Sequence, residues 1–172
     1  MKTSETSENR ANFKLWFARI LADLAKDPHA GFATMMIALP LLERYLRQKT
    51  SNFEEPPLSP AFRNELVCCF PNLKDEAGAK DFWSIFRHGV LHQGTFRCLK
   101  NGAGASGTLA NCAEAVEVDA SGNFVVNPVK FAAAVVKLIE DDFVTFEGCG
   151  SPHHPLAYVV GNTTLTPALS TA

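Results

Sequence analysis

The chain has 172 residues, of which 47% are hydrophobic, so its length and composition suit a single domain with a substantial core. Its formal net charge is −2 and its isoelectric point is near 6.2, which excludes binding to nucleic acid through bulk positive charge and would require a local basic patch. Five cysteines without a Cys-x2-Cys pair, together with the lack of a secretory signal, predict a reduced, cytoplasmic protein.

The first fifty residues predict two helices. Residues 1–10 are polar and are expected to be flexible. Apolar residues then recur at helical spacing and predict an amphipathic helix that ends before Pro28. A second helix is predicted over residues 31–48, with a kink or an early break at Pro40. The longest apolar run, residues 32–42, is too short to span a bilayer, so no membrane role is predicted.

Two further helices are predicted before residue 95. Ser59 is a typical N-cap and Pro60 a typical first residue of a helix, and this third helix is predicted to end at Pro71. A fourth helix is predicted to start at residue 74 or 75. It is predicted to end near Gly94, because glycine commonly terminates helices.

The character of the sequence changes after residue 100. Residues 101–108 are rich in glycine, alanine and serine and predict a flexible loop. Apolar segments at 115–118 and 124–126 flank a turn-forming sequence and predict a β-hairpin. Asn127 and Pro128 then predict the start of a last long helix that continues to residue 146.

These elements predict a mainly α fold, a helical bundle with a small β-hairpin inserted before the last long helix. The single helical domain is expected over residues 11–147. Residues 1–10 form a flexible N-terminus in this prediction, and residues 148–172 form an irregular C-terminal tail. Four large aromatic side chains are predicted to lie in the core and not to stack on bases: Trp16, Phe17, Trp83 and Phe86.

The segment at 86–94, Phe-Arg-His-Gly-Val-Leu-His-Gln-Gly, contains side chains capable of catalysis at a recognisable spacing. Arg87 and His92 are five residues apart and would lie about 140° apart on a straight α-helix, so they can cooperate only if the helix loosens near Gly89 or ends early. Histidine transfers protons near neutral pH and arginine binds phosphate through two hydrogen bonds, a pair suited to metal-free phosphodiester cleavage. The alternative is that these residues only complement the helix dipole.

The same segment resembles the motif of the HEPN superfamily of helical domains, in which an arginine and a polar residue are followed, after three positions, by a histidine near a helix end. Arg87, His88 and His92 match these positions. The resemblance implies an antiparallel helical bundle, often dimeric, in which two motifs face one cleft. Many members of this superfamily are metal-independent endoribonucleases of toxin–antitoxin or other defence systems, and others are non-catalytic binding or scaffold domains.

The resemblance implies roles for individual residues. Arg87 would clamp the phosphate, His92 would act as the acid or base, and His88 would orient or support them. No metal or other cofactor is expected. The expected partners are RNA, a second copy of the chain, and an antitoxin or other partner protein. The alternative function is a non-catalytic scaffold, or a nucleotide-binding or dimerisation module. Three side chains that follow the motif histidine are expected to bind substrate: Gln93, Arg97 and Lys100.

Other candidate sites in the sequence are weaker. His88 and His92 have the spacing of helical metal ligands, but no second ligand pair stands at a matching interval. Cys68 and Cys69 lie within the third predicted helix and are interpreted as small buried side chains, not as nucleophiles. Four charged residues of the second helix are expected on its solvated side, where they could line a cleft beside the motif: Glu43, Arg44, Arg47 and Lys49.

Overall fold

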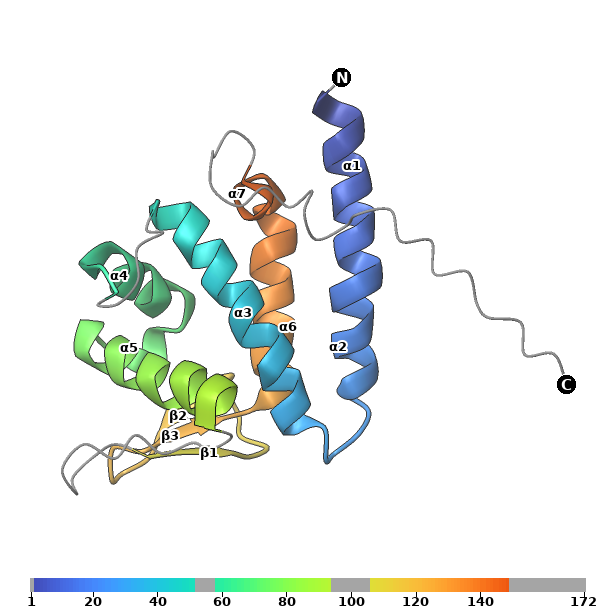
Figure 1. The fold of residues 1–172 in the computed structure, drawn as a ribbon. Helices are drawn as coiled ribbons and strands as arrows, with labels where there is room; N and C mark the ends of the chain where they lie inside the picture. The colour runs from blue at the N-terminus through green and yellow to red at the C-terminus, as the bar shows by residue number, and fades with distance from the viewer. Residues whose placement is uncertain (1, 52–57, 94–105, 149–172) are drawn as a thin grey trace, which may run out of the picture.

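The computed structural model describes residues 2–51, 58–93 and 106–148, without the side chains of residues 2–6 and 91–93. It is mostly helical and contains one small three-stranded sheet, which confirms the mainly α fold. Figure 1 shows α1 and α2 as one long rod, with α3 and α6 running in the opposite direction to it. Helix α3 contacts α2 on one side and α4 on the other, and it packs most extensively against α6.

The N-terminal rod consists of α1 (Lys2–Phe13), a short π-helical segment η1 (Lys14–Ala18) and α2 (Arg19–Leu24). The helix therefore begins about ten residues earlier than the sequence predicts. Two polar side chains attach its first part to the rest of the fold. Asn9 donates a hydrogen bond of 2.6 Å to the Glu147 carboxylate, and the guanidinium of Arg10 lies 5.0 Å from the centre of the Phe143 ring. These partners lie more than 130 residues away, so local sequence does not reveal them.

Helix α3 (Gly31–Thr50) continues through Pro40, so the predicted break is wrong. Pro40 lies on the exposed side of the helix, where Met36, four residues earlier, is also exposed. The Met36 carbonyl that loses its intrahelical donor can therefore bond to water. The opposite side packs leucines at helical spacing into the core, among them Leu39, Leu42 and Leu46, and this burial holds the helix together.

The predicted helix starts at Ser59 and Asp75 are confirmed. Ser59 precedes α4 (Pro60–Cys69), and its hydroxyl accepts a hydrogen bond of 3.2 Å from the Phe62 amide. A 3₁₀ turn, η2 (Pro71–Leu73), follows. Asp75 precedes α5 (Glu76–Trp83), and its carboxylate accepts a hydrogen bond of 2.8 Å from the Gly78 amide. Such caps satisfy amides that have no partner within the helix.

The sheet contains the predicted hairpin and one strand that the sequence does not predict. Strands β2 (Val116–Val118) and β3 (Phe124–Val126) pair antiparallel, as expected. Strand β1 (Gly107–Leu109) pairs in parallel with the other edge of β3, giving the order β1-β3-β2. Residues 107 and 108 were expected in a flexible loop, because a three-residue strand is too short to show alternation.

Glycine is required at the start of β1 because the strand approaches the helix that carries the motif. A β-carbon at Gly107 would lie 2.6 Å from the Phe86 ring and 2.7 Å from the Ile85 side chain. Both neighbours are fully buried, so neither can move aside cheaply. The strand thus covers the motif helix at a distance that any larger residue would prevent.

The last predicted helix is divided in two. Asn127 caps α6 (Pro128–Asp141) by accepting a hydrogen bond of 3.1 Å from the Lys130 amide, as its sequence position predicts. At Asp142 the backbone leaves helical geometry, with φ −129° and ψ 52°, and α7 (Phe143–Glu147) follows. The change of direction places the Phe146 ring 5.3 Å from the Phe13 ring of α1. This aromatic contact, remote in sequence, explains why the helix does not continue straight.

Candidate functional site

The motif lies on a π-helix, η3 (Ser84–Gln93), which continues directly from α5. Three apolar side chains fasten η3 to the core: Ile85, Phe86 and Val90 are at most 3% exposed. The Phe86 ring lies 4.9 Å from that of Phe82 in α5. The first part of η3 is therefore anchored in the core.

The π-helical winding reduces the angle around the helix axis between the positions of Arg87 and His92. On an α-helix the two positions are about 140° apart. In a π-helix the hydrogen bonds run from residue i to residue i+5, so residues five apart lie one turn from each other along the same side of the helix. The backbone of η3 thus meets the condition that the sequence left open, namely that the helix must loosen within the motif. π-Helical segments occur frequently at functional sites.

Arg87 is held by a carboxylate on the neighbouring helix. Its Nε donates to Glu43 Oε2 at 2.9 Å, and its Nη2 donates to Glu43 Oε1 at 3.4 Å. The same Oε1 accepts hydrogen bonds from Arg47, at 2.9 Å from Nε and 2.8 Å from Nη2. Glu43 therefore joins two guanidinium groups, one from its own helix and one from η3. We call these three residues the arginine–glutamate cluster.

The arginine–glutamate cluster consists of partly buried side chains, two cationic and one anionic. The side chains of Glu43, Arg47 and Arg87 are 12%, 17% and 23% exposed, respectively. Two guanidinium groups and one carboxylate give the cluster a formal charge of +1, since two positive charges oppose one negative charge. Partial desolvation strengthens attraction to a nearby anion, because less water screens the charges. Arg47 and Arg87 also have interaction partners in addition to Glu43.

The other two charged residues of α3 have a structural role. Arg44 donates to the carbonyls of Phe146 and Glu147 at 3.1 and 3.2 Å, and so closes the C-terminal end of α7. Lys49 donates to the Asp142 carboxylate at 3.0 Å, where α6 ends. These residues do not join the motif, in contrast to Glu43 and Arg47. The sequence does not show which of these four charged residues contacts the motif. Its one signal is the i, i+4 spacing of Glu43 and Arg47, which favours an ion pair.

The remaining predicted site residues are only partly placed. His88 lies within η3, is partly buried and has interaction partners. Gln93 is the last residue of η3, and its backbone alone is described. Arg97 and Lys100 fall outside the described residues. Among the residues that the structure describes, no cluster of three histidine, cysteine or acidic side chains could hold a metal ion.

Burial explains why Cys69 makes a poor nucleophile. Cys69 is half-buried at the end of α4, and burial, assisted by the nearby charge of Glu65, raises the pKa of its thiol to about 12. Only the thiolate attacks, so the reactive fraction near neutral pH is very small. The expectation that both neighbouring cysteines are buried is wrong for Cys68, which α4 turns outward into solvent.

We expect Cys69 to react at least about a hundredfold more slowly with a disulfide reagent at pH 8 in the folded chain than in the denatured chain. The raised pKa and the limited access both act in this direction. The measurement uses a variant in which Cys69 is the sole cysteine. A variant that keeps only Cys68 is the control and should react nearly as fast folded as unfolded. Similar rates for the two folded variants would contradict the expectation.

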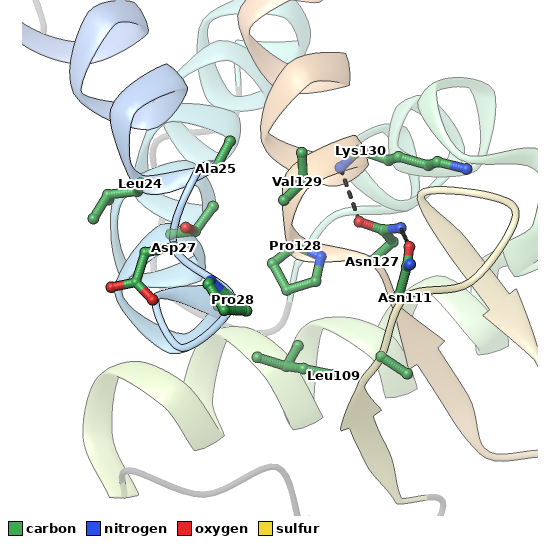
Figure 2. Close-up of a pocket in the computed structure, with 13 residues that line it drawn as sticks. Leu24, Ala25, Asp27, Pro28, Leu109, Asn111, Asn127, Pro128, Val129 and Lys130 are labelled. Carbon is green, nitrogen blue, oxygen red and sulfur yellow. Dashed lines mark hydrogen bonds between the residues drawn. The ribbon is translucent and has the colours of Figure 1, made fainter.

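A pocket of about 420 Å³ lies apart from the motif. Figure 2 shows the turn between α2 and α3 on one side, with Leu24 and Pro28, and the start of α6 on the other, with Pro128 and Val129. Leu109 of β1 lies below them. No residue of the motif segment lines this pocket.

The polar groups of this pocket are already engaged. The Asn127 amide donates to Asn111 Oδ1 at 3.1 Å, and the Lys130 ammonium donates to the Ala113 carbonyl. On the opposite wall, the Asp27 carboxylate accepts a hydrogen bond of 2.8 Å from the His29 amide. The lining contains no histidine or cysteine. Its ionisable side chains, Asp27 and Lys130, lie on opposite walls and each already forms a hydrogen bond, so the arginine–glutamate cluster with η3 is the better candidate for chemistry.

The chain matches no family model, no curated protein and no solved structure in the comparisons with known proteins. The resemblance to the HEPN superfamily thus rests on the motif and the helical layout alone. Within the described ranges, none of the helices combines the length and the apolar character that crossing a membrane requires.

Proposed function

We propose that the chain is a HEPN-like domain that binds RNA at its Arg87–His92 motif and cleaves it without a metal ion. One observation supports the proposal: η3 is π-helical, so the backbone positions of Arg87 and His92 lie one turn apart, and Arg87 belongs to the partly buried arginine–glutamate cluster. The partly desolvated cluster suits a phosphate group, because a guanidinium offers two parallel donors to two phosphate oxygens.

In the proposed reaction, a histidine base removes the proton of a ribose 2′-hydroxyl, and the 2′-oxygen attacks the adjacent phosphorus. The bond from phosphorus to the 5′-oxygen breaks, and that oxygen receives a proton from an acid group. The products are a 2′,3′-cyclic phosphate and a 5′-hydroxyl. His92 serves in proton transfer, and Arg87 stabilises the negative charge that grows on the phosphoryl oxygens. His88 supports the two groups from the same helix.

Glu43 has two consequences for this chemistry. It holds the guanidinium of Arg87 in one orientation, with a hydrogen bond of 2.9 Å to Nε, which lowers the entropy that phosphate binding must overcome. It also competes with phosphate for the same donors, so substrate must bind beside the carboxylate and share the positive charge. Arg47 moderates this competition because it occupies Oε1 of Glu43 from the other side.

The test compares cleavage of mixed RNAs, in the presence of a chelator, by the natural chain and by the variants Arg87→Ala and His92→Ala. Each substitution is expected to slow cleavage by at least about a hundredfold, since it removes phosphate stabilisation or proton transfer. Arg63→Ala is a matched control, because Arg63 is also a partly buried arginine in an ion pair, with Glu76 at 2.9 Å. Cleavage that survives both motif substitutions, or that the chelator abolishes, would contradict the proposal.

A non-catalytic module is the second candidate, and the pairing of Arg87 with Glu43 favours it, because the pair links η3 to α3 and so also stabilises the fold. In this case the natural chain binds RNA, a nucleotide or a second copy without cleaving RNA. Filter binding of labelled RNA and sedimentation of the natural chain, measured beside the cleavage assay, distinguish the two candidates. Binding that Arg87→Ala weakens, without cleavage by the natural chain, would favour the module.

A further inference from the structure

The N-terminal rod exposes a group of large apolar side chains. Leu15, Trp16 and Ile20 are 49%, 46% and 40% exposed, although the sequence pattern predicts Trp16 to lie in the core. Trp16 and Ile20 are four residues apart and neighbours on the helix surface. We call these three residues the N-helix patch. Grouped apolar side chains of this size on a surface usually mark a site that another segment covers.

The chain leaves the described structure close to this patch. Gly148 follows α7, which lies beside the upper part of α1 (Figure 1). Glu147, the preceding residue, accepts the hydrogen bond of 2.6 Å from Asn9. Asn9 and Trp16 are seven residues apart on the rod and are separated by about 10 Å along its axis. The C-terminal segment therefore begins after Gly148 at a distance of about 10 Å along the rod from Trp16.

The composition of the C-terminal segment suits an apolar surface. Residues 149–172 contain no aspartate, glutamate, lysine or arginine, whereas segments that stay solvated are usually rich in charge. They contain one continuous apolar run, Leu-Ala-Tyr-Val-Val at 156–160. Eight residues lead from Gly148 to the start of this run, and eight residues can span up to about 26 Å. The run can therefore reach all three residues of the patch.

We propose that residues 156–160 of the chain's own C-terminal segment dock on the N-helix patch and bury Trp16. The tether raises the effective concentration of the run at the patch to the millimolar range, so a modest apolar contact is sufficient for occupancy. Because the run carries no charge, docking desolvates no ionic group of the segment. This role of the tail is independent of the proposed RNA cleavage.

The test uses the full chain labelled with 5-fluorotryptophan, because the sequence contains two tryptophans, Trp16 and Trp83, and thus gives two ¹⁹F signals. The substitution Trp16→Phe assigns the signals. In a variant with Leu156→Ser, Tyr158→Ser and Val159→Ser, a soluble nitroxide is expected to broaden the Trp16 signal at least about twofold more than in the natural chain. The Trp83 signal, from a side chain that is 2% exposed, should not change and reports that the fold is intact.

A matched control replaces two leucines of the same segment outside the run, Leu165→Ser and Leu169→Ser, and should leave the Trp16 signal unchanged. Equal broadening of Trp16 in the natural chain and in the triple variant would overturn the proposal. So would protection of Trp16 that disappears on dilution, since a second copy would then cover the patch. Ile20→Ser provides an independent test: chymotrypsin should cut at Tyr158 severalfold faster in this variant, and an unchanged rate would contradict docking.

Discussion

Replacing Glu43 with alanine is expected to lower the free energy of unfolding by about 2–4 kcal/mol. The substitution removes the carboxylate that lies between Arg47 and Arg87, 2.8 and 2.9 Å from their nearest nitrogens. The two positive charges then face each other in a partly desolvated site. Unfolding by urea, followed by circular dichroism, measures the loss.

The matched control for Glu43 is Glu76, which forms one ion pair with Arg63 at 2.9 Å and is 40% exposed. Glu76→Ala removes a carboxylate with a single arginine partner and is expected to cost about 1 kcal/mol or less. In the double variant Glu43→Ala with Arg87→Ala, part of the loss should be recovered, because one of the two opposed charges is gone. If Glu43→Ala proves no more harmful than Glu76→Ala, the arginine–glutamate cluster is not a structural unit.

Phe82→Ala is expected to destabilise the fold by about 3–5 kcal/mol, the largest effect of any substitution considered for this chain. Phe82 is completely buried, and its ring centre lies 4.9 Å from that of Phe86, 5.9 Å from Phe124 and 6.0 Å from Phe131. It therefore joins α5 and η3 to β3 and α6. Removal of the ring leaves a cavity between α5 and the three elements that pack against it, η3, β3 and α6. These elements cannot all move inward to fill it. Chemical denaturation is again the measurement.

Two control substitutions are expected to destabilise the fold much less than Phe82→Ala. Phe82→Leu keeps most of the volume and is expected to cost less than about 1.5 kcal/mol. Val144→Ala removes an apolar side chain that is 60% exposed, and its effect should stay within about 0.5 kcal/mol. A loss for Phe82→Ala close to that for Val144→Ala would show that the aromatic cluster does not hold the motif helix in place. Because η3 depends on this cluster, Phe82→Ala should also weaken any activity of the motif.

The helix boundaries that the sequence predicts correctly are those set by chemistry within four residues. Ser59, Asp75 and Asn127 cap helices through their own side chains, each bonded to an amide three residues later. The β2–β3 hairpin is similarly local, because its strands flank a turn in which the Asp119 carboxylate accepts a hydrogen bond of 2.8 Å from the Ser121 amide. Such signals are visible in the sequence because both partners lie in one short segment.

The predictions that proved wrong depended on distant partners. The helix begins at Lys2 and not near residue 12, since Asn9 and Arg10 find partners at the other end of the chain. Strand β1 forms because it pairs in parallel with the edge of β3, which is remote in sequence. Trp16, predicted to be buried by its periodicity, is exposed because it lies in η1, within a rod at the margin of the bundle that has only one packed side (Figure 1).

At the candidate site, the amino-acid sequence specifies one arginine and two histidines at a fixed spacing, together with the family resemblance that they carry. The relative positions of these residues, and the partner of Arg87, depend on the tertiary structure. The π-helical winding of η3, which no spacing rule predicts, places Arg87 and His92 one turn apart, and the packing of α3 against η3 brings Glu43, 44 residues away, to Arg87. Spacing is a local property of the chain, whereas the winding of a buried helix and the partner of its arginine depend on packing between elements remote in sequence.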